Sequence, residues 1–415
     1  MHQITAENLT SMRGMLILSN IIVFKELFKN STIISKSILD SFIYEMENII
    51  FFYLTEYFMN IDLLTKNCSR ETIESWLRAT DQESLFKLYA LADSTRRAHV
   101  GDDVFLRGLI EWSNICRRSC LYCGLRSENK KINRYRMSAG ELVECAKRAL
   151  GYGYKTIVLQ AGEDPELTGD VVADAIHQIR NATGQAITLS LGERTREELA
   201  LWREAGADRY LIRFETSNKK LYEHIHPSLP CGRDRFSVLD DLRELGYEVG
   251  TGVMVGIPGQ RYEDLANDIL LFRDYDFDMI GLGPWLPHPE AKLSSNQNLI
   301  DDQVPNDVSM TCKMLAITRI LCPSINIPAT TALATLDPKS GREQGLSCGA
   351  NILMPNCTPL KYRGFYEIYT GKVCAVEDEY DCQSNMIQLV LSIGRTIGDG
   401  VGTSKNFERR MRDKI

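Results

Sequence analysis

The sequence predicts an α/β protein built as a (β/α)8 TIM barrel, with an N-terminal helical extension and a C-terminal helical segment. Two observations lead to this fold. From residue 105 onward, short apolar or β-branched runs alternate with amphipathic stretches, and eight such runs follow one another. Eight strands with intervening helices over about 250 residues are what a TIM barrel requires. An open doubly wound sheet also alternates strands with helices, but rarely with eight evenly distributed strands.

The expected strands are short apolar runs, as found where parallel strands are buried on both faces. They cover Phe105–Trp112, Thr156–Glu163, Ala186–Glu193, Arg209–Thr216, Glu248–Gly256, Asp278–Trp285, Asn326–Ala332 and Ala350–Asn356. The expected helices between them include Ala139–Leu150, Asp170–Arg180, Arg235–Leu245, Tyr262–Phe272 and Val308–Leu321. Ser138 and Glu141 have the spacing of a capping box, which predicts a helix start there.

The chain divides into four parts. Residues 1–60 form an extension with no assigned role, 61–104 a helical lead-in, 105–360 the barrel, and 361–415 a segment that closes it. The longest nearly apolar run of the extension, Met15–Phe24, has ten residues. A membrane crossing needs about 20 residues, so we expect no membrane span; a targeting role is the alternative reading.

Charge and cysteine content restrict the function classes. A net charge of −7 argues against a nucleic-acid partner, which would require a basic surface. Single cysteines in patterned segments are expected to be small buried thiols: Cys68, Cys145, Cys231, Cys312, Cys322 and Cys348. A secreted disulfide scaffold would be shorter and richer in loops. We therefore expect a reducing compartment, the cytoplasm, with an anaerobic organelle of a eukaryote as the alternative.

Three cysteines form a tight group directly after the first expected strand. Cys116, Cys120 and Cys123 have C-x3-C-x2-C spacing. A [4Fe–4S] cluster normally takes four thiolates, so three leave one iron open to a substrate or cofactor. Structural zinc, which wants four ligands, and chance spacing of buried thiols are the alternatives. The adjacent Arg117 and Arg118 argue against buried thiols, so the sequence predicts one iron–sulfur cluster.

Polar residues end several of the expected strands. They stand at Gln160–Glu163, Ser190–Glu193, Arg213–Thr216, Thr330–Thr331 and Met354–Asn356. In a barrel, the carboxyl ends of the strands converge on one face, where active sites are built. The sequence therefore places an active site at that face.

The cysteine group, with Tyr122 as its aromatic position, resembles the signature of the radical S-adenosylmethionine (SAM) superfamily. Further blocks resemble [FeFe]-hydrogenase maturases of the HydE type, in register from about residue 62 to the C-terminus: Cys120–Arg126, Leu159–Pro165, Thr188–Glu193, Arg209–Thr216, Met254–Gln260, Gly281–Pro289 and Ile327–Thr331. The resemblance implies that SAM binds the open iron and that one-electron reduction splits it into methionine and a 5′-deoxyadenosyl radical. Methylornithine synthase, biotin synthase and a non-catalytic iron–sulfur scaffold are the alternatives.

The resemblance also implies roles for individual residues. Gly162 and Glu163 would meet the SAM amino group with Gln160 beside them, Glu215 would accept from the ribose hydroxyls, and Arg235 would contact the SAM carboxylate unless it is a solvated helix-start residue. The implied substrate positions are Thr188, Arg209, Arg213, Thr331, Met354 and Tyr366. Two arginines inside a barrel are costly unless an anion or carboxylates such as Glu215 or Glu193 compensate them, so a structural network is the alternative.

The resemblance also implies that a second, optional cluster can bind through a C-x7-C-x2-C pattern near the C-terminus. Cys374 and Cys382 have the first spacing, but Asn385 occupies the third position. Two thiolates do not ordinarily hold a cube, so we expect this cluster to be absent or unstable. The resemblance implies an iron-bearing small-molecule substrate, a one-electron donor such as a ferredoxin or flavodoxin, and other hydrogenase maturation proteins as partners, with no nucleic acid and no membrane.

Overall fold

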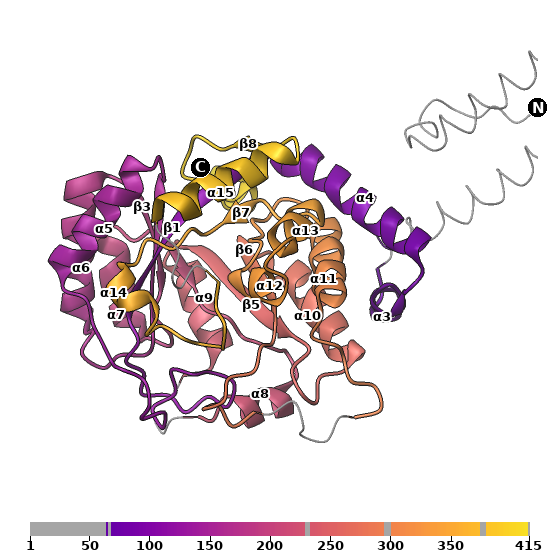
Figure 1. The fold of residues 1–415 in the computed structure, drawn as a ribbon, viewed down its shortest axis with the longest axis horizontal. Coiled ribbons are helices and arrows are strands. Elements are labelled where there is room, and N and C mark those ends of the chain that lie inside the picture. The colour runs from indigo at the N-terminus through magenta and orange to yellow at the C-terminus, as the bar shows by residue number, and fades with distance from the viewer. Residues whose placement is uncertain (1–63, 65–67, 229–232, 294–299, 374–378, 414–415) are drawn as a thin grey trace, which may run out of the picture. The chain divides into compact units, whose positions relative to one another are not determined.

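The computed structural model describes residues 64, 68–228, 233–293, 300–373 and 379–413, and Cys68–Ile415 form one compact unit (Figure 1). The N-terminal extension expected over residues 1–60 lies outside the described residues. No helix in the described part of the chain is both long and apolar enough to cross a bilayer.

The centre of the unit is a parallel sheet. Its strands are β1 Asp103–Ser113, β2 Thr156–Ala161, β3 Ala186–Ser190, β4 Arg209–Leu211, β5 Glu248–Val255, β6 Met279–Pro284, β7 Ile352–Leu353 and β8 Thr396–Ile397. The strand order is β6-β5-β4-β3-β2-β1-β7, and β8 pairs with the start of β1. Every pairing is parallel, as the alternating sequence pattern predicts.

Residues 326–329 close the ring between β6 and β7. Asn326 bridges Met279 of β6, and Pro328 bridges Ile352 of β7. Proline has no backbone N–H to donate, which explains why this segment forms single bridges rather than a regular strand. Seven of the eight predicted strands coincide with β1 to β7. The remaining one, Asn326–Ala332, is present only as bridges over residues 326–329, and a helix begins at Thr331. Strand β8 was not predicted, but the predicted (β/α)8 barrel is confirmed.

Helices cover the outside of the barrel, with α5, α6 and α7 on the left of the barrel and α10 and α11 on the right (Figure 1). One or more helices follow each strand. In chain order they are α5 Ala139–Gly151, α6 Gly169–Thr183, α7 Arg196–Glu204, α8 Lys219–Ile225, α9 Arg235–Glu244, α10 Tyr262–Tyr275, α11 Val308–Leu321, α12 Thr331–Leu336, α13 Gly341–Ser347, α14 Leu360–Arg363, α15 Glu379–Ser392 and α16 Lys405–Arg412. The five predicted helices are confirmed. So is the capping box of α5, where Glu141 N donates to Ser138 Oγ (3.3 Å) and Ser138 N donates to Glu141 Oε2 (2.9 Å).

Two helices precede the barrel. Helix α3, Arg70–Arg78, packs against α10, and α4, Gln82–Val100, packs along α11. Arg78 forms a two-pronged ion pair with Asp302 at 2.7 and 2.8 Å. Lys313 on α11 donates to the carbonyl of Ala79 (3.1 Å) and so holds the end of α3.

The C-terminal segment closes the barrel at the amino ends of the strands. Arg107 Nη2 and Asn326 Nδ2 both donate to the carbonyl of Gly402, at 2.8 and 2.9 Å. Ser404 N donates to Glu248 Oε1 (3.0 Å). Residues 401–404 therefore plug this end, which lies opposite α8 (Figure 1).

A second C-terminal loop, residues 366–373, crosses the carboxyl ends of the strands. The Lys372 ammonium forms a buried ion pair with Glu111 of β1 and also donates to the carbonyl of Tyr366 (3.2 Å). Val373 N donates to Thr335 Oγ1 (3.2 Å). The loop is thus fixed to the barrel interior by a charged pair and to α12 by a hydrogen bond to a threonine side chain.

Candidate active site

The loop that carries the three cysteines is held from three sides. It follows β1 at the carboxyl ends of the strands. Arg117 N donates to the carbonyl of Glu163 after β2 (3.0 Å), Leu121 N to that of Ile225 at the end of α8 (2.8 Å), and Gly124 N to that of Ile368 in the C-terminal loop (2.9 Å). These contacts set the position of each cysteine relative to the barrel mouth.

Gly162 fits against the cysteine loop only because it has no side chain. A Cβ there would lie 2.4 Å from the carbonyl oxygen of Ile115 and 2.7 Å from Cys116 Cβ. Neither atom belongs to a flexible side-chain end, so a larger residue would have to displace the loop. The Gly-Glu pair after β2 therefore brings the second strand into direct contact with the first cysteine.

The three cysteines are free thiols in a shielded setting. Cys120 is buried, and Cys116 and Cys123 are partly buried. Burial raises the pKa of all three thiols, that of Cys120 to about 12, so a positive partner such as iron is needed to hold them as thiolates. Among the residues that the structure describes, no three His, Cys, Asp or Glu side chains form a site for a single metal ion. A cube is different, because its cysteines bind separate irons.

An apolar cluster packs against the cysteine loop. Leu121 and Tyr122 of the loop lie against a group of buried residues contributed by α8, β5, β6 and the loops after them: Leu221, Ile225, Met254, Ile257, Trp285 and Leu293. This packing keeps water away from one side of the loop. It also accounts for the aromatic residue in the C-x-aromatic-C part of the motif.

A network of charged and polar side chains lies beside Cys120. Arg118 Nη1 donates to Glu193 Oε2 (3.2 Å), and Arg235 Nε donates to Glu193 Oε1 (3.2 Å). His226 lies between them, with its Nδ1 3.1 Å from Cys120 Sγ. Burial, followed by the charges of Arg235 and Arg118, lowers the pKa of His226 to about 4, which keeps its ring neutral.

The residues expected to bind SAM lie around this loop. Glu163 is buried, and its Oε1 accepts from Glu193 N (3.1 Å). Gln160 Nε2 donates to Tyr366 OH (3.2 Å) across the barrel. Arg235 is 8% exposed and joins the network beside Cys120, so it is not a solvated helix-start residue.

Glu215 has an unusual backbone. Its φ is +64°, a value that non-glycine residues seldom adopt and that often marks functional sites. The following loop is held by α10, because Ser217 N donates to Asp268 Oδ1 (2.6 Å) and Asn218 Nδ2 donates to Asp264 Oδ1 (2.9 Å). Glu215 Oε2 is buried and accepts no hydrogen bond from any described residue, although it forms an ion pair with Arg213.

Several expected substrate residues face the same interior. Thr188 Oγ1 and Arg213 Nε are buried and have no hydrogen-bond partner in the described part of the chain. Arg213 Nη2 lies 3.3 Å from Glu215 Oε2, so this arginine is compensated as the sequence allowed. Tyr366 is buried, whereas Met354 after β7 and Thr331 at the start of α12 are partly exposed.

Arg209 is not brought to the cysteine loop. It opens β4, and its Nε forms an ion pair with Glu248 Oε2 at 2.5 Å. Its Nη2 donates to the carbonyl of Val401 in the C-terminal plug (3.1 Å). Arg209 and Arg213 are four residues apart, and a strand rises about 3.3 Å per residue, so the two arginines lie near opposite ends of the barrel.

Sequence reasoning missed three residues of this region. Glu111 and Lys372 are 261 residues apart and pair inside the barrel, and His226 contacts Cys120 from the end of α8. An acidic residue within an expected buried strand was the available signal for Glu111. No sequence pattern singled out His226 or Lys372, because their partners are distant along the chain.

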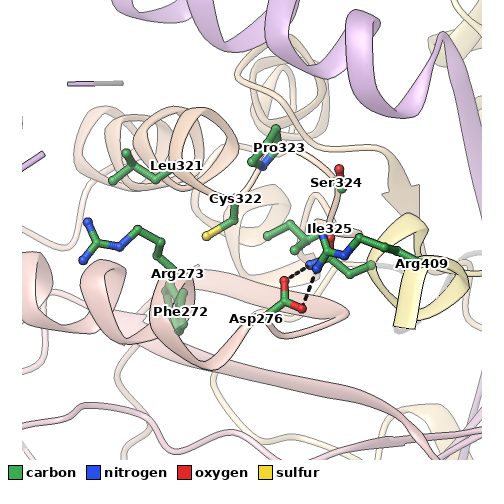
Figure 2. Close-up of a pocket in the computed structure, with 10 residues that line it drawn as sticks. Phe272, Arg273, Asp276, Leu321, Cys322, Pro323, Ser324, Ile325 and Arg409 are labelled. Atoms are coloured by element: carbon green, nitrogen blue, oxygen red, sulfur yellow. Dashed lines mark hydrogen bonds and ion pairs between the residues drawn. The ribbon is translucent and has the colours of Figure 1, made fainter. Parts of the chain in front are cut away.

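A separate pocket lies on the outer wall, between the ends of α10 and α11 and helix α16 (Figure 2). The Cys322 thiol borders it, and Arg409 Nη2 pairs with Asp276 Oδ2 at 2.6 Å. The ends of α10 and α11 precede the amino ends of β6 and of the 326–329 segment. This pocket is therefore at the far end of the barrel from the cysteines.

The fold and the cysteine loop agree with the comparisons with known proteins. The model of the radical SAM superfamily matches residues 110–272, and the chain is an enzyme of this SAM-cleaving class. The [FeFe] hydrogenase maturase subunit HydE of Thermotoga maritima is 46% identical over 341 residues, which cover 82% of this chain and 95% of that protein. The chain belongs to the HydE family.

Other relatives share the fold. The 3-methylornithine synthase of Methanosarcina acetivorans is 29% identical over 290 residues, covering 69% of this chain and 78% of that protein. A crystal structure of methylornithine synthase superposes with a TM-score of 0.70 at 21% identity, covering 85% of this chain and 99% of that one. The maturase HydG from Carboxydothermus hydrogenoformans gives 0.68 at 20% identity, covering 85% and 81%. These structures support the barrel fold.

Proposed function

We propose that the protein holds a single [4Fe–4S] cluster on Cys116, Cys120 and Cys123, cleaves SAM with it, and acts in assembly of the [FeFe]-hydrogenase active-site cluster. One observation carries the proposal: three thiols lie on a fixed loop at the carboxyl ends of a closed barrel, in a chain 46% identical to HydE over 95% of that protein. When bound and reduced, the cluster supplies the electron that splits SAM.

The chain's own residues would bind and orient SAM. The carboxylate of Glu163 and the carbonyl of Gly162 are acceptors suited to a protonated amine. Glu215, whose Oε2 accepts no hydrogen bond from a described residue and lies 3.3 Å from Arg213 Nη2, would accept from the ribose hydroxyls. Arg235 would meet the SAM carboxylate, since a guanidinium can donate two hydrogen bonds to it. Tyr122 and Gln160 border the same site.

The barrel interior would hold the substrate. Thr188 and Arg213 have buried polar atoms without partners in the described chain, and Thr331, Met354 and Tyr366 would line the opposite wall. An arginine suits an anionic group, which supports a small iron-bearing molecule with sulfur, cyanide and carbonyl ligands. We leave Arg209 out of this set because it lies at the plugged end of the barrel, where it contacts Glu248 and the carbonyl of Val401.

Closure of the barrel at both ends supports radical chemistry. Residues 401–404 plug one end, and the loop of residues 366–373 crosses the other. Exclusion of water and other reactants protects a reactive intermediate from side reactions. A scaffold that only stored a cluster would not need this enclosure.

We further propose that the chain carries no second cluster. Cys374 lies outside the described residues, nothing is described of the Cys382 side chain, and Asn385 is exposed on α15. Two thiolates do not ordinarily hold a cube. The remaining partners of the proposal are a ferredoxin or flavodoxin as electron donor and other hydrogenase maturation proteins, all in the cytoplasm.

Anaerobic reconstitution with iron and sulfide tests the proposal. We expect about four irons per chain, an EPR signal of the reduced protein that changes on addition of SAM, and formation of 5′-deoxyadenosine. Cys120→Ala should abolish all three, whereas Cys145→Ala, which removes a buried thiol on α5, should retain them. Zinc in place of iron, or a cluster indifferent to SAM, would contradict the proposal.

The substrate needs its own test. Methylornithine synthase is the enzyme alternative, since it shares the fold and 29% identity. The reconstituted protein should support activation of an apo-hydrogenase in a maturation assay and should not convert lysine to methylornithine. The opposite pattern would reassign the chain within the superfamily.

A further inference from the structure

A histidine ring contacts the sulfur of the second cysteine. His226 caps the carboxyl end of α8, is 1% exposed, and places Nδ1 3.1 Å from Cys120 Sγ. The neighbouring Leu121 N donates to the carbonyl of Ile225 (2.8 Å), which fixes the end of α8 to the cysteine loop. The contact is therefore built into the backbone of both segments.

The plane of the imidazole is fixed by aromatic neighbours. Tyr122 stacks with the ring at 6.4 Å between centroids and 22° between planes, and Tyr222 at 5.0 Å and 27°. Tyr122 belongs to the cysteine motif itself and Tyr222 to α8. The ring is held by both segments and cannot turn freely away from Cys120.

The neighbours of the other ring nitrogen favour one tautomer when the cluster is bound. Nε2 contacts Arg118 Nη2 and lies 3.1 Å from Arg235 Nη2, and guanidinium groups only donate. Glu193 Oε1, also 3.1 Å from Nε2, already accepts from Arg235 Nε (3.2 Å). A metal-bound cysteine sulfur is a thiolate, which only accepts. Nδ1 also lies 3.3 Å from Tyr122 OH, which can accept as well as donate. The tautomer with its proton on Nδ1 is compatible with this hydroxyl and satisfies the sulfur and both arginines.

We propose that His226 donates a hydrogen bond from Nδ1 to the Cys120 sulfur of the iron–sulfur cluster and thereby raises the reduction potential of that cluster. The proposal rests on the cluster assignment made above. Hydrogen bonds to the sulfurs help to set the potential of such clusters. The added electron places more negative charge on the sulfurs, so a donor stabilises the reduced form more than the oxidised form. Arg118 and Arg235 act as positioning residues, because they hold the acceptor side of the ring.

A redox titration of the reconstituted protein, followed by EPR without SAM, tests the role of His226. His226→Phe keeps the stacked ring and removes the donor. At a fixed solution potential we expect its ratio of reduced to oxidised cluster to fall about tenfold, a shift of about 59 mV for one electron. His177→Asn, on the exposed face of α6, is the control and should leave the potential unchanged.

Two further variants separate hydrogen bonding from a structural role. His226→Asn places an amide N–H near the position of Nδ1, whereas His226→Gln places it near Nε2. We expect the asparagine variant to stay closer to the wild-type potential and the glutamine variant to resemble phenylalanine. The comparison of the asparagine and glutamine variants tests the hydrogen bond from Nδ1 even if the phenylalanine variant fails to take up iron.

The outcomes distinguish this proposal from the proposed function. A wild-type protein with four irons and a SAM-dependent EPR change, whose potential is the same in all three His226 variants, would overturn the role of His226 and leave the radical SAM assignment intact. A wild-type protein that binds no cluster would overturn both. A nitrogen hyperfine coupling to the reduced cluster that disappears in His226→Phe would support the donor.

Discussion

At the scale of single residues, Asp268 shows how a buried carboxyl supports the site. It accepts from Ser217 N (2.6 Å) and so fixes the loop after Glu215, while its Oδ2 has no partner among the described residues. Burial raises the pKa of Asp268 to about 7. The carboxyl therefore carries a proton in the folded protein at pH values where it is ionised in the unfolded chain.

This shift predicts a pH dependence of stability. The folded state binds more protons than the unfolded state between about pH 4, the unfolded pKa, and pH 7, so its stability falls as the pH rises through this range, by about 1.36 kcal/mol per unit of pKa shift. Asp268→Asn keeps the acceptor for Ser217 and removes the ionisation. Urea unfolding should show the variant gaining stability relative to wild type from pH 5 to pH 7.5. A constant difference across this range would contradict the assignment.

The sequence predicted a place at the site for Glu215 but not for His226. Glu215 ends an expected strand and belongs to a recognisable block, so its place at the site was predicted from local pattern. The positive φ of Glu215 and the contact between His226 and Cys120 depend on α10 and on the cysteine loop. No local pattern encodes those partners.

At the scale of elements, the contact between the residues after β2 and the cysteine loop constrains the site closely. Gly162→Ala would introduce a Cβ 2.4 Å from the Ile115 carbonyl oxygen and 2.7 Å from Cys116 Cβ. We expect the reconstituted variant to hold less than half the iron of wild type, because the loop must move, and packed interiors do not absorb such overlaps without strain. Iron analysis and EPR measure the effect.

A matched glycine variant serves as the control. A Cβ at Gly140, in the first turn of α5, would meet nothing within 4 Å, and alanine favours a helix over glycine by about 0.5–1 kcal/mol. Gly140→Ala should keep full iron content and raise the melting temperature slightly. Normal iron content in Gly162→Ala would show that the loop accommodates a side chain.

The periodicity of the sequence predicted where most strands and helices lie. The positions of strands β1 to β7 and of five helices were predicted, since apolar runs and amphipathic stretches reflect burial directly; strand β8, Thr396–Ile397, was not. The length and regularity of the strands were not predicted. The segment at residues 326–329 forms only bridges because of Pro328, and β4 spans three residues, Arg209–Leu211, before the chain turns toward Glu215.

At the scale of the whole molecule, the two ends of the barrel differ in the residues that they carry. One end carries the three cysteines of the loop after β1, the residues proposed to bind SAM, and the loop held by Lys372. The other is closed by residues 401–404 through Arg107, Arg209 and Glu248. We therefore expect the charges at the closed end to contribute to stability rather than to substrate binding.

Glu248→Gln tests this division. It leaves Arg209, which is 4% exposed, without its carboxylate, and breaking a buried ion pair costs about 3–5 kcal/mol. We expect chemical denaturation to show a loss of this size, while the folded variant keeps its iron content and its SAM-dependent EPR signal. Loss of SAM cleavage in a folded, iron-loaded variant would place Arg209 and Glu248 in the active site after all.

The sequence by itself determined the barrel, the positions of strands β1 to β7 and the C-x3-C-x2-C loop after the first strand, because these depend on patterns confined to short stretches of chain. Tertiary structure decided which end of the barrel each arginine occupies, the pairing of Glu111 with Lys372, and the contact of His226 with Cys120. Each of these depends on charge compensation or hydrogen bonding between residues far apart in sequence. Buried polar groups need such partners, and only the folded chain brings them together.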